Sequence, residues 1–291
     1  MRALVTGADG FIGRHITARL RELYFEVQRV GYTHKFDARD FFRFDDGREH
    51  FDLVIHCAAV VGGRALIEQS ALAHAVNLEI DAAMFRWAER VKPGRVVYFS
   101  SVAAYPARLQ TFGAGRRLTE GDVNWNHPRP PDELYGWAKL TGELLAARAR
   151  QAGVNVTVVR PFGVYGPGQD PATPFAGFLR QARDKADPIR VWGLGNQIRD
   201  FIHISDVVEA VLVLAHQGVD REVNLCSGRL IRLNQAARMF ADAAGYSPDI
   251  LGDETKAAGV EYRVGSPSVL HQYYVPQISL EQGIKDMWER G

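Results

Sequence analysis

A tyrosine and a lysine lie four residues apart in a segment that follows a proline-rich stretch. The segment "PPDELYGWAKLTGE" covers residues 130–143 and contains Tyr135 and Lys139. In an α-helix, residues four apart lie on one face with neighbouring side chains. This spacing suits a phenol whose proton is loosened by a nearby ammonium group, and it equally suits an ordinary surface turn. The pair alone does not decide between chemistry and structure.

Three glycines follow the first apolar run at intervals of three residues. In "VTGADGFIGRH" they are Gly7, Gly10 and Gly13. One glycine permits a tight turn, one lets a pyrophosphate approach the backbone, and one lets helix and strand pack closely. The N–H groups at the start of the helix then point at the phosphates. A glycine pattern alone indicates only a turn, but the strand before it and the amphipathic helix after it predict a dinucleotide site.

The elements that must position these residues alternate along the first part of the chain. Strand-like runs rich in β-branched residues cover 3–7, 51–59, 94–101 and 154–162. Such runs are typical of strands buried on both faces of a parallel sheet. Helix-like stretches lie between them, at 11–23, 69–91 and 132–152. The alternation predicts an α/β fold built on a Rossmann-type doubly wound parallel sheet.

The texture changes after residue 165, where Gly and Pro cluster and the later segments become shorter. We expect a dinucleotide-binding domain over 1–165 and a smaller, mixed α/β substrate-binding domain over 166–291. Residues 200–228 are expected to contribute back to the first domain, because they contain a helix-like stretch and a strand-like run.

Composition and charge exclude several classes of protein. Of the 291 residues, 46% are hydrophobic and 24% charged, and the net charge is +1, so nothing indicates a nucleic-acid or membrane partner. The two cysteines and nine histidines lack metal-ligand spacing, which predicts no metal site and a reducing compartment. The N-terminal residues lead straight into a strand and turn without a signal-peptide pattern. We therefore expect a cytoplasmic protein.

Several segments, in sequence order, resemble the extended short-chain dehydrogenase/reductases of the NAD-dependent epimerase/dehydratase type. The resemblance covers nearly the whole chain and rests on the TGxxGxxG turn, "FDARD", "VIHCAA", "AVNLEI", "RPFGVYGPG", "RDFIHISDV" and "VNLCSG". It implies an NAD(P)-dependent enzyme whose substrate is a nucleoside-diphosphate sugar.

The resemblance also implies a set of cofactor-binding residues. Asp37 would meet the adenine, and the small side chains of Ala58 and Ala59 would let the cofactor lie close to their strand. The whole implied set is Gly7, Gly10, Phe11, Ile12, Gly13, Asp37, Ala38, Ala58, Ala59, Ser100, Tyr135, Lys139, Pro161 and Phe162.

By the same resemblance, the catalytic residues are Ser101, Tyr135 and Lys139. Moving a hydride at a carbon that bears a hydroxyl requires a proton to move at the oxygen. The reference pKa of tyrosine is about 10, and both the Lys139 ammonium and a positively charged nicotinamide would favour the phenolate. Ser101 would hydrogen-bond the same substrate oxygen, and Lys139 would also hold the nicotinamide ribose. Without the resemblance, two serines that merely end a strand would be the simpler interpretation.

Two arginines stand where the family grips a nucleoside diphosphate. The planar guanidinium groups of Arg199 and Arg263 suit the oxygens of a pyrophosphate. With Ser101 and Tyr135 they form the implied substrate-binding set. Ser266 and Gly163 depart from residues common in the family, which leaves the nucleotide and the sugar open.

Absent residues narrow the reaction. Val102 and Ala103 stand where dehydratases of the family carry an Asp-Glu pair, and no cysteine lies nearby to shuttle protons at neighbouring carbons. The remaining chemistry is hydride transfer at one carbinol carbon. We expect a nucleotide-sugar 4-epimerase, with an NAD(P)H-dependent nucleotide-sugar 4-ketoreductase as the alternative. A non-catalytic dinucleotide-binding protein is the alternative from another class.

The choice of cofactor depends on the end of the second strand. No acid stands there before Asp37, and His34 and Lys35 could attract a 2′-phosphate. NAD is the expected cofactor and NADP stays open. A homodimer formed through helices 69–91 and 132–152 is an expectation of the resemblance.

Overall fold

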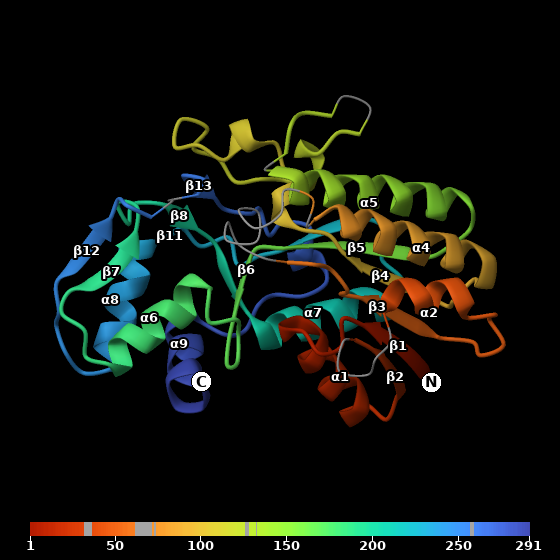
Figure 1. Ribbon diagram of the computed structural model, residues 1–291, viewed down its shortest axis with the longest axis horizontal. Helices are drawn as coiled ribbons and strands as arrows, with labels where there is room; N and C mark the ends of the chain where they lie inside the picture. The colour runs from red at the N-terminus through yellow and green to blue at the C-terminus, as the bar shows by residue number, and fades with distance from the viewer. Residues whose placement is uncertain (32–36, 62–71, 73, 126–127, 132, 257–258) are drawn as a thin grey trace. The chain divides into compact units, whose positions relative to one another are not determined.

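The structure is a computed structural model that describes residues 1–31, 37–61, 72, 74–125, 128–131, 133–256 and 259–291 (Figure 1). Its α-helices are α1 (Phe11–Glu22), α2 (Ala38–Phe44), α4 (Ala75–Val91), α5 (Glu133–Gln151), α6 (Pro174–Arg183), α7 (Ile204–His216), α8 (Leu233–Ala243) and α9 (Leu280–Arg290). Its strands are β1 (Arg2–Thr6), β2 (Glu26–Val30), β3 (Leu53–His56), β4 (Val96–Phe99), β5 (Val156–Pro161), β6 (Gly163–Tyr165), β7 (Ile189–Trp192), β8 (Ile198–Arg199), β9 (Phe201–His203), β10 (Glu222–Leu225), β11 (Ile231–Arg232), β12 (Ile250–Asp253) and β13 (Tyr262–Arg263).

Six strands form the central sheet in the order β10-β5-β4-β3-β1-β2. The pairs from β2 through β5 are parallel, and β3 and β4 are buried along their whole length. The chain places β2 on one side of β1 and β3 on the other, so the order reverses at β1. Open α/β sheets bind ligands at the carboxyl ends of the strands beside such a reversal. The Rossmann-type prediction is confirmed.

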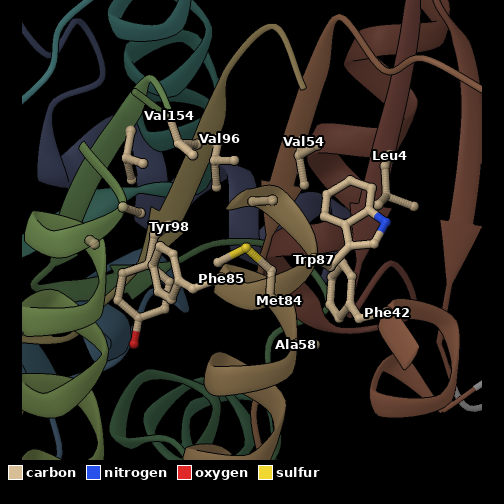
Figure 2. Close-up of a cluster of buried hydrophobic side chains, with 14 of the residues drawn as sticks. Leu4, Phe42, Val54, Ala58, Met84, Phe85, Trp87, Val96, Tyr98 and Val154 are labelled. Carbon is tan, nitrogen blue, oxygen red and sulfur yellow. The ribbon is translucent and has the colours of Figure 1, made fainter. Parts of the chain in front are cut away.

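Helices cover both faces of this sheet. In Figure 1, α2, α4 and α5 lie along one side of the strands, and α1 and α7 lie along the other. Under α2 and α4, a cluster of buried apolar side chains joins the helices to the strands. Figure 2 shows Trp87 beside Phe42 and Phe85 beside Tyr98, with ring centroids 5.2 and 5.3 Å apart. The Tyr98 oxygen lies at the edge of the cluster.

The chain divides into two compact units that exchange short segments. The first unit contains Met1–Pro106, Glu120–Pro161 and Val208–Val223, and the second contains the rest. A single boundary at residue 165 would assign residues 107–119 to the first domain, whereas they belong to the second unit. The domain limits of 1–165 and 166–291 therefore stay a coarse prediction.

The second unit has smaller sheets and its own core. Its strands pair as β11-β8-β13, β12-β7 and β6-β9. Aromatic rings of α6, α8 and β6 pack together in its interior, among them Phe175, Phe240 and Tyr165. The last helix, α9, begins with a capping box in which Ser279 and Gln282 bind each other's backbone N–H.

Candidate active site

The glycine turn joins β1 to α1 and leaves no room for side chains. Gly7 has a φ of +66°, and a Cβ built there would lie 2.8 Å from backbone atoms of Cys57 and Ala58. A Cβ at Gly13 would lie 2.2 Å from the Gly7 carbonyl oxygen. The turn therefore packs directly against the end of β3 and the start of α1.

The start of α1 offers backbone donors to an anion. Gly10 is the N-cap residue, and its N–H donates to the Gly7 carbonyl oxygen at 3.0 Å. Phe11, Ile12 and Gly13 form the first helical turn, whose N–H groups lack partners within the helix. These donors and the helix dipole fit the pyrophosphate of a dinucleotide.

The chain beyond β3 is fixed beside this turn. The Ala58 N–H donates to Thr6 Oγ1 at 3.4 Å, and Ala58 is buried while Ala59 is half-buried. The buried Asn77 side chain accepts from the Val60 N–H at 2.7 Å and donates to the Val60 carbonyl at 3.0 Å. Asn77 thus holds the segment where the cofactor is expected to lie.

Asp37 caps α2. Its Oδ1 accepts from the Arg39 N–H at 2.8 Å, and its Oδ2 lies 2.7 Å from Arg39 Nη2. Hydrogen bonding from Arg39 holds the pKa of the Asp37 carboxyl below its usual range. Ala38, the first residue of α2, is buried. Adenine contacts by Asp37 and Ala38 stay a prediction.

Ser100 and Ser101 follow the carboxyl end of β4 and have different partners. The buried Ser100 hydroxyl donates to Glu143 Oε1 at 2.5 Å, and contact of Ser100 with the cofactor stays a prediction. Ser101 is half-buried, and its Oγ accepts from the Ala103 N–H at 3.1 Å at the start of a short 3₁₀ helix, Val102–Ala104.

A glycine lets the first turn of α5 approach this 3₁₀ helix. A Cβ at Gly136 would lie 2.3 Å from the Ala103 carbonyl oxygen, so only glycine fits there. The approach places Tyr135, the preceding residue, close enough for Ser101 to hydrogen-bond its phenol. Helix α5 thus brings the serine and the tyrosine together, and Lys139 follows one turn later.

Four effects act on the pKa of the Tyr135 phenol, two in each direction. Burial raises its pKa, the Lys139 ammonium lowers it, Asp81 raises it, and the hydrogen bond with Ser101 lowers it. The net pKa lies above the ordinary value, opposite in direction to the effect of Lys139 on which the sequence argument rests. The physical reason is that desolvation outweighs one partly neutralised charge.

Lys139 is buried beside a counter-ion. Its Nζ lies 3.6 Å from Asp81 Oδ2 and 3.5 Å from the Tyr98 hydroxyl. The Tyr98 hydroxyl donates to Asp81 Oδ2 at 2.5 Å. Lys139 and Asp81 are 2% and 1% exposed, so the two side chains form a buried ion pair.

A second chain of hydrogen bonds leads from Asp81 to β1. His56 Nε2 lies 3.2 Å from Asp81 Oδ1, and His56 Nδ1 lies 2.8 Å from Thr6 Oγ1. Burial lowers the pKa of His56 and favours its neutral form. Burial opposes ionisation of Asp81, but Lys139 and the His56 hydrogen bond keep the pKa of its carboxyl below the usual range.

A buried ion pair lies one helical turn beyond Lys139. Arg160 of β5 donates to both oxygens of Glu143, with Nε at 2.8 Å and Nη2 at 2.6 Å. Arg160 Nη1 also donates to the Tyr105 hydroxyl at 3.0 Å. Since Ser100 binds the same carboxylate, this pair ties α5, β4 and β5 together behind the catalytic candidates.

The other predicted cofactor residues lie where β5 ends. Pro161 is the last residue of β5, and the Phe162 N–H donates to the Leu225 carbonyl at 3.0 Å. Phe162 is buried. Contact of either residue with a cofactor stays a prediction.

In the second unit, the two predicted substrate arginines are direct neighbours. Arg199 of β8 and Arg263 of β13 are register partners in a parallel pair. Arg199 Nη1 donates to the Ile198 carbonyl at 3.0 Å, and Arg263 Nε donates to Gln110 Oε1 at 2.5 Å. Arg199 Nη2 also donates to the Val260 carbonyl at 2.5 Å. Contact of either arginine with a substrate pyrophosphate stays a prediction.

Asp200 holds the loops beside these arginines. Its Oδ1 accepts from the Ser227 N–H and hydroxyl at 2.9 and 2.7 Å, and its Oδ2 accepts from the N–H groups of Gly228 and Gly265 at 2.9 and 3.2 Å. Burial raises the pKa of the Asp200 carboxyl to about 6 despite these donors.

Some sequence predictions lie outside the described residues. They include His34 and Lys35, the two cations considered for a 2′-phosphate. Across the part of the chain that is described, no group of three or more His, Cys, Asp or Glu side chains is arranged to hold a metal ion. In that same part, no helix has both the length and the apolar character needed to cross a membrane.

Sequence reasoning missed the buried polar residues behind the site, namely Asp81, Tyr98, Glu143 and Arg160. One signal was available for two of them. Asp81 and Glu143 interrupt the faces of α4 and α5 that are otherwise turned to the sheet, where an acid requires a partner.

Comparison with known proteins gives consistent matches over this whole arrangement. The pattern of the NAD dependent epimerase/dehydratase family matches residues 3–226. A dTDP-4-dehydro-6-deoxy-D-allose reductase of Streptomyces bikiniensis is 32% identical over 288 residues, covering 90% of this chain and 86% of its own.

Two solved structures share the fold. UDP-glucose 4-epimerase of Thermus thermophilus, in complex with NAD, matches with a TM-score of 0.83 at 23% identity, covering 100% of this chain and 98% of its own. RMD from Pseudomonas aeruginosa, complexed with NADPH, matches with a TM-score of 0.80 at 24% identity, covering 99% and 98%.

Proposed function

Since the chain belongs to the NAD dependent epimerase/dehydratase family, we propose that it transfers a hydride at a single carbinol carbon of a nucleoside-diphosphate sugar. The outcome we propose first is 4-epimerisation. The same residues would serve a 4-ketoreductase, so the two candidates differ in what happens after the first hydride transfer.

One observation carries the proposal: the close approach of α5 to the end of β4 at Gly136. It sets the Tyr135 phenol beside Ser101, with the Lys139 ammonium one turn away. A protein that only bound a dinucleotide would have no use for a phenol held between a hydroxyl and a buried cation. The arrangement therefore supports catalysis over simple binding.

The side chains divide the work at the sugar oxygen. Tyr135 would take the proton from the carbinol or return it, and Ser101 would hydrogen-bond the same oxygen and fix its position. Lys139 favours the phenolate, and the positive charge of an oxidised nicotinamide, which supplies the hydride acceptor when it is bound, adds to that effect. Val102 and Ala103 supply no further acid or base. The site is thus equipped for one proton and one hydride.

The binding groups agree with a dinucleotide and a nucleotide sugar. The glycine turn and the first turn of α1 would hold the cofactor pyrophosphate, with the chain at Ala58 and Ala59 beside it. Arg199 and Arg263 would grip the substrate pyrophosphate, since a guanidinium group suits phosphate oxygens. Ser101 and Tyr135 would meet the sugar.

The 4-ketoreductase has a specific observation in its favour. The Streptomyces bikiniensis relative, at 32% identity, is a reductase of a 4-dehydro sugar nucleotide. Retention of cofactor separates the two candidates, because an epimerase regenerates its cofactor in every cycle and a reductase consumes it. NAD that survives purification and dialysis supports the epimerase. Stoichiometric consumption of NADPH with a 4-ketosugar nucleotide supports the reductase.

The test of the catalytic role is Tyr135→Phe. We expect turnover of nucleoside-diphosphate hexoses to fall by about 10² to 10⁴, the usual contribution of a general acid or base. Nucleotide affinity should persist, because only the hydroxyl is removed. Tyr24→Phe is the matched control, since Tyr24 is 94% exposed. Unchanged turnover in the Tyr135 variant would exclude the proposed role.

We further propose a homodimer and a cytoplasmic location. Leu78 of α4 and Trp137 and Leu144 of α5 are 37, 42 and 40% exposed, which supports an apolar contact surface on these two helices. Cys57 and Cys226 are both free thiols, which supports a reducing compartment.

A further inference from the structure

Asp9 of the glycine turn lies across the end of β2. Its Oδ1 is 2.6 Å from Arg29 Nη2. Its Oδ2 would be 2.4 Å from a Cβ built at Gly31, the residue directly after β2. The carboxylate thus fills the place where a side chain at the end of the second strand would stand.

That place has a known chemical meaning in dinucleotide-binding sheets. An acid there accepts hydrogen bonds from the adenosine ribose hydroxyls of NAD, whereas an arginine nearby accommodates the 2′-phosphate of NADP. In this chain the strand itself supplies a glycine, and the turn supplies the acid. We propose that Asp9 binds the adenosine ribose and makes the protein select NAD over NADP.

Arg29 is a cation at the end of β2, where it could favour the 2′-phosphate of NADP. We infer that it does not reverse the preference for NAD. Residues 29 and 31 lie on one face of the strand, and the Arg29 guanidinium is matched by the Asp9 carboxylate at 2.6 Å. A 2′-phosphate carries up to about two negative charges, and next to this pair it would meet the carboxylate of Asp9 at close range. Arg29 therefore acts as a positioning residue that holds Asp9 over Gly31.

The position of Asp9 is fixed by the same turn that would hold the pyrophosphate. Gly10, the next residue, closes the turn onto Gly7 and begins α1. The backbone of Asp9 also approaches strand β2, since its nitrogen would lie 3.5 Å from a Cβ at Gly31. The adjacent residues Asp9 and Gly10 would thus bind the ribose and the pyrophosphate, respectively. The inference depends on the dinucleotide site of the proposed function and not on the sugar.

The first experiment titrates the apoprotein with NAD and NADP by calorimetry. The wild type should bind NAD at least about tenfold more tightly, and Asp9→Asn should weaken NAD binding by about tenfold to a hundredfold, as expected for a hydrogen bond to a charged group. Binding of NADP should not weaken, so the preference should collapse. Glu22→Ala, an exposed acid at the far end of α1, is the control.

A second variant tests the location of the charge. Asp9→Ala combined with Gly31→Asp moves the carboxylate from the turn to the strand, where the nearest atoms to a new Cβ all belong to Asp9. The double variant should regain preference for NAD relative to Asp9→Ala alone.

Three results would overturn the inference: equal or tighter binding of NADP by the wild type, equal weakening of both nucleotides in Asp9→Asn, or a double variant with no regained preference. A protein that binds NAD as expected but turns over no nucleotide sugar would count against the proposed function and leave the role of Asp9 intact.

Discussion

Lys139 and Asp81 form an ion pair inside the protein, with Nζ 3.6 Å from Oδ2. The pair is nearly inaccessible to solvent, and Tyr98 and His56 supply hydrogen bonds to the remaining carboxylate positions. A buried ion pair rarely stabilises a fold on balance, whereas loss of one partner costs about 3–5 kcal/mol. At the scale of single residues, this pair is better explained by the reaction than by stability.

Asp81 opposes the effect of Lys139 on Tyr135, which gives a prediction for the pH profile. The charged and polar groups that face the phenol are Lys139, Asp81 and Ser101, with the His74 ring at 5.1 Å. Asp81→Asn removes the negative charge, so the pKa of Tyr135 should fall. Oxidation requires the phenolate, and the pH at which kcat/KM for oxidation rises should move lower.

Tyr98→Phe is the matched control for that variant. It removes a hydroxyl from the same carboxylate but leaves the charge of Asp81 in place. Its profile should stay near that of the wild type. Because the chain has ten tyrosines, the ultraviolet titration of Tyr135 is obtained as the difference between each protein and the same protein carrying Tyr135→Phe. An unchanged pH profile for Asp81→Asn, or a shift to higher pH, would contradict the conclusion that the Asp81 charge raises the pKa of Tyr135.

At the scale of elements, α5 carries two glycines that let other groups approach it. Gly136 admits the Ala103 carbonyl, and Gly142 admits the Tyr98 hydroxyl, since a Cβ there would lie 1.9 Å from that oxygen. Helix propensity alone would disfavour glycine at both positions. Their presence indicates that close approach to β4 and its following turn outweighs the local loss.

Gly142→Ala tests this balance. An alanine within a helix normally gains about 1 kcal/mol over glycine, but overpacking against Tyr98 should cost about 1–3 kcal/mol and give a net loss of stability. Gly177→Ala in α6 is the control, because nothing lies within 4 Å of a Cβ there. Urea unfolding should show a lower free energy of unfolding for Gly142→Ala and a higher one for Gly177→Ala. A higher value for both variants would show that the Tyr98 hydroxyl moves aside at little cost.

The elements were the part of the structure that the sequence predicted best. The periodic stretch 132–152 became α5 (Glu133–Gln151), and the apolar run 154–162 contains β5. Long periodic segments are predictable because one face must be buried whatever the partner. The two-residue strands β8 and β13 have no such pattern, and only their pairing defines them.

The sequence was sufficient to predict the candidate catalytic and glycine residues of the site, but not the buried polar residues that contact them. Tyr135 and Lys139 stand out through helical spacing, and Gly7, Gly10 and Gly13 through their context. In the sequence, Asp81 and Glu143 look like ordinary acids of amphipathic helices. Their buried cationic partners, Lys139 and Arg160, are identified only by the three-dimensional structure. Contacts of the predicted cofactor and substrate residues with their ligands stay predictions.

At the scale of the whole molecule, stability should depend on pH through Asp200. Its pKa is raised from 3.8 to about 6 in the folded state, so the folded protein holds this proton where the unfolded chain has released it. Its contribution to stability is complete below the unfolded value and declines as pH rises through about 6. The loss amounts to about 3 kcal/mol.

The measurement compares wild type and Asp200→Asn by urea unfolding at a series of pH values. The advantage of the wild type should shrink as pH rises from about 4 to 6, and carbon NMR of the carboxyl should show the titration directly. A difference that is constant with pH would refute the raised pKa.

The interleaving of the two units bears on the order in which the chain can fold during synthesis. The edge strand β10 of the central sheet ends at residue 225, after the chain has already contributed residues 162–207 to the other unit. A ribosome therefore releases the last strand of the first sheet only after about half of the second unit has been synthesised. Neither unit is a contiguous stretch of sequence, so a nascent chain halted at residue 165 would leave one long edge of β5 without its neighbour.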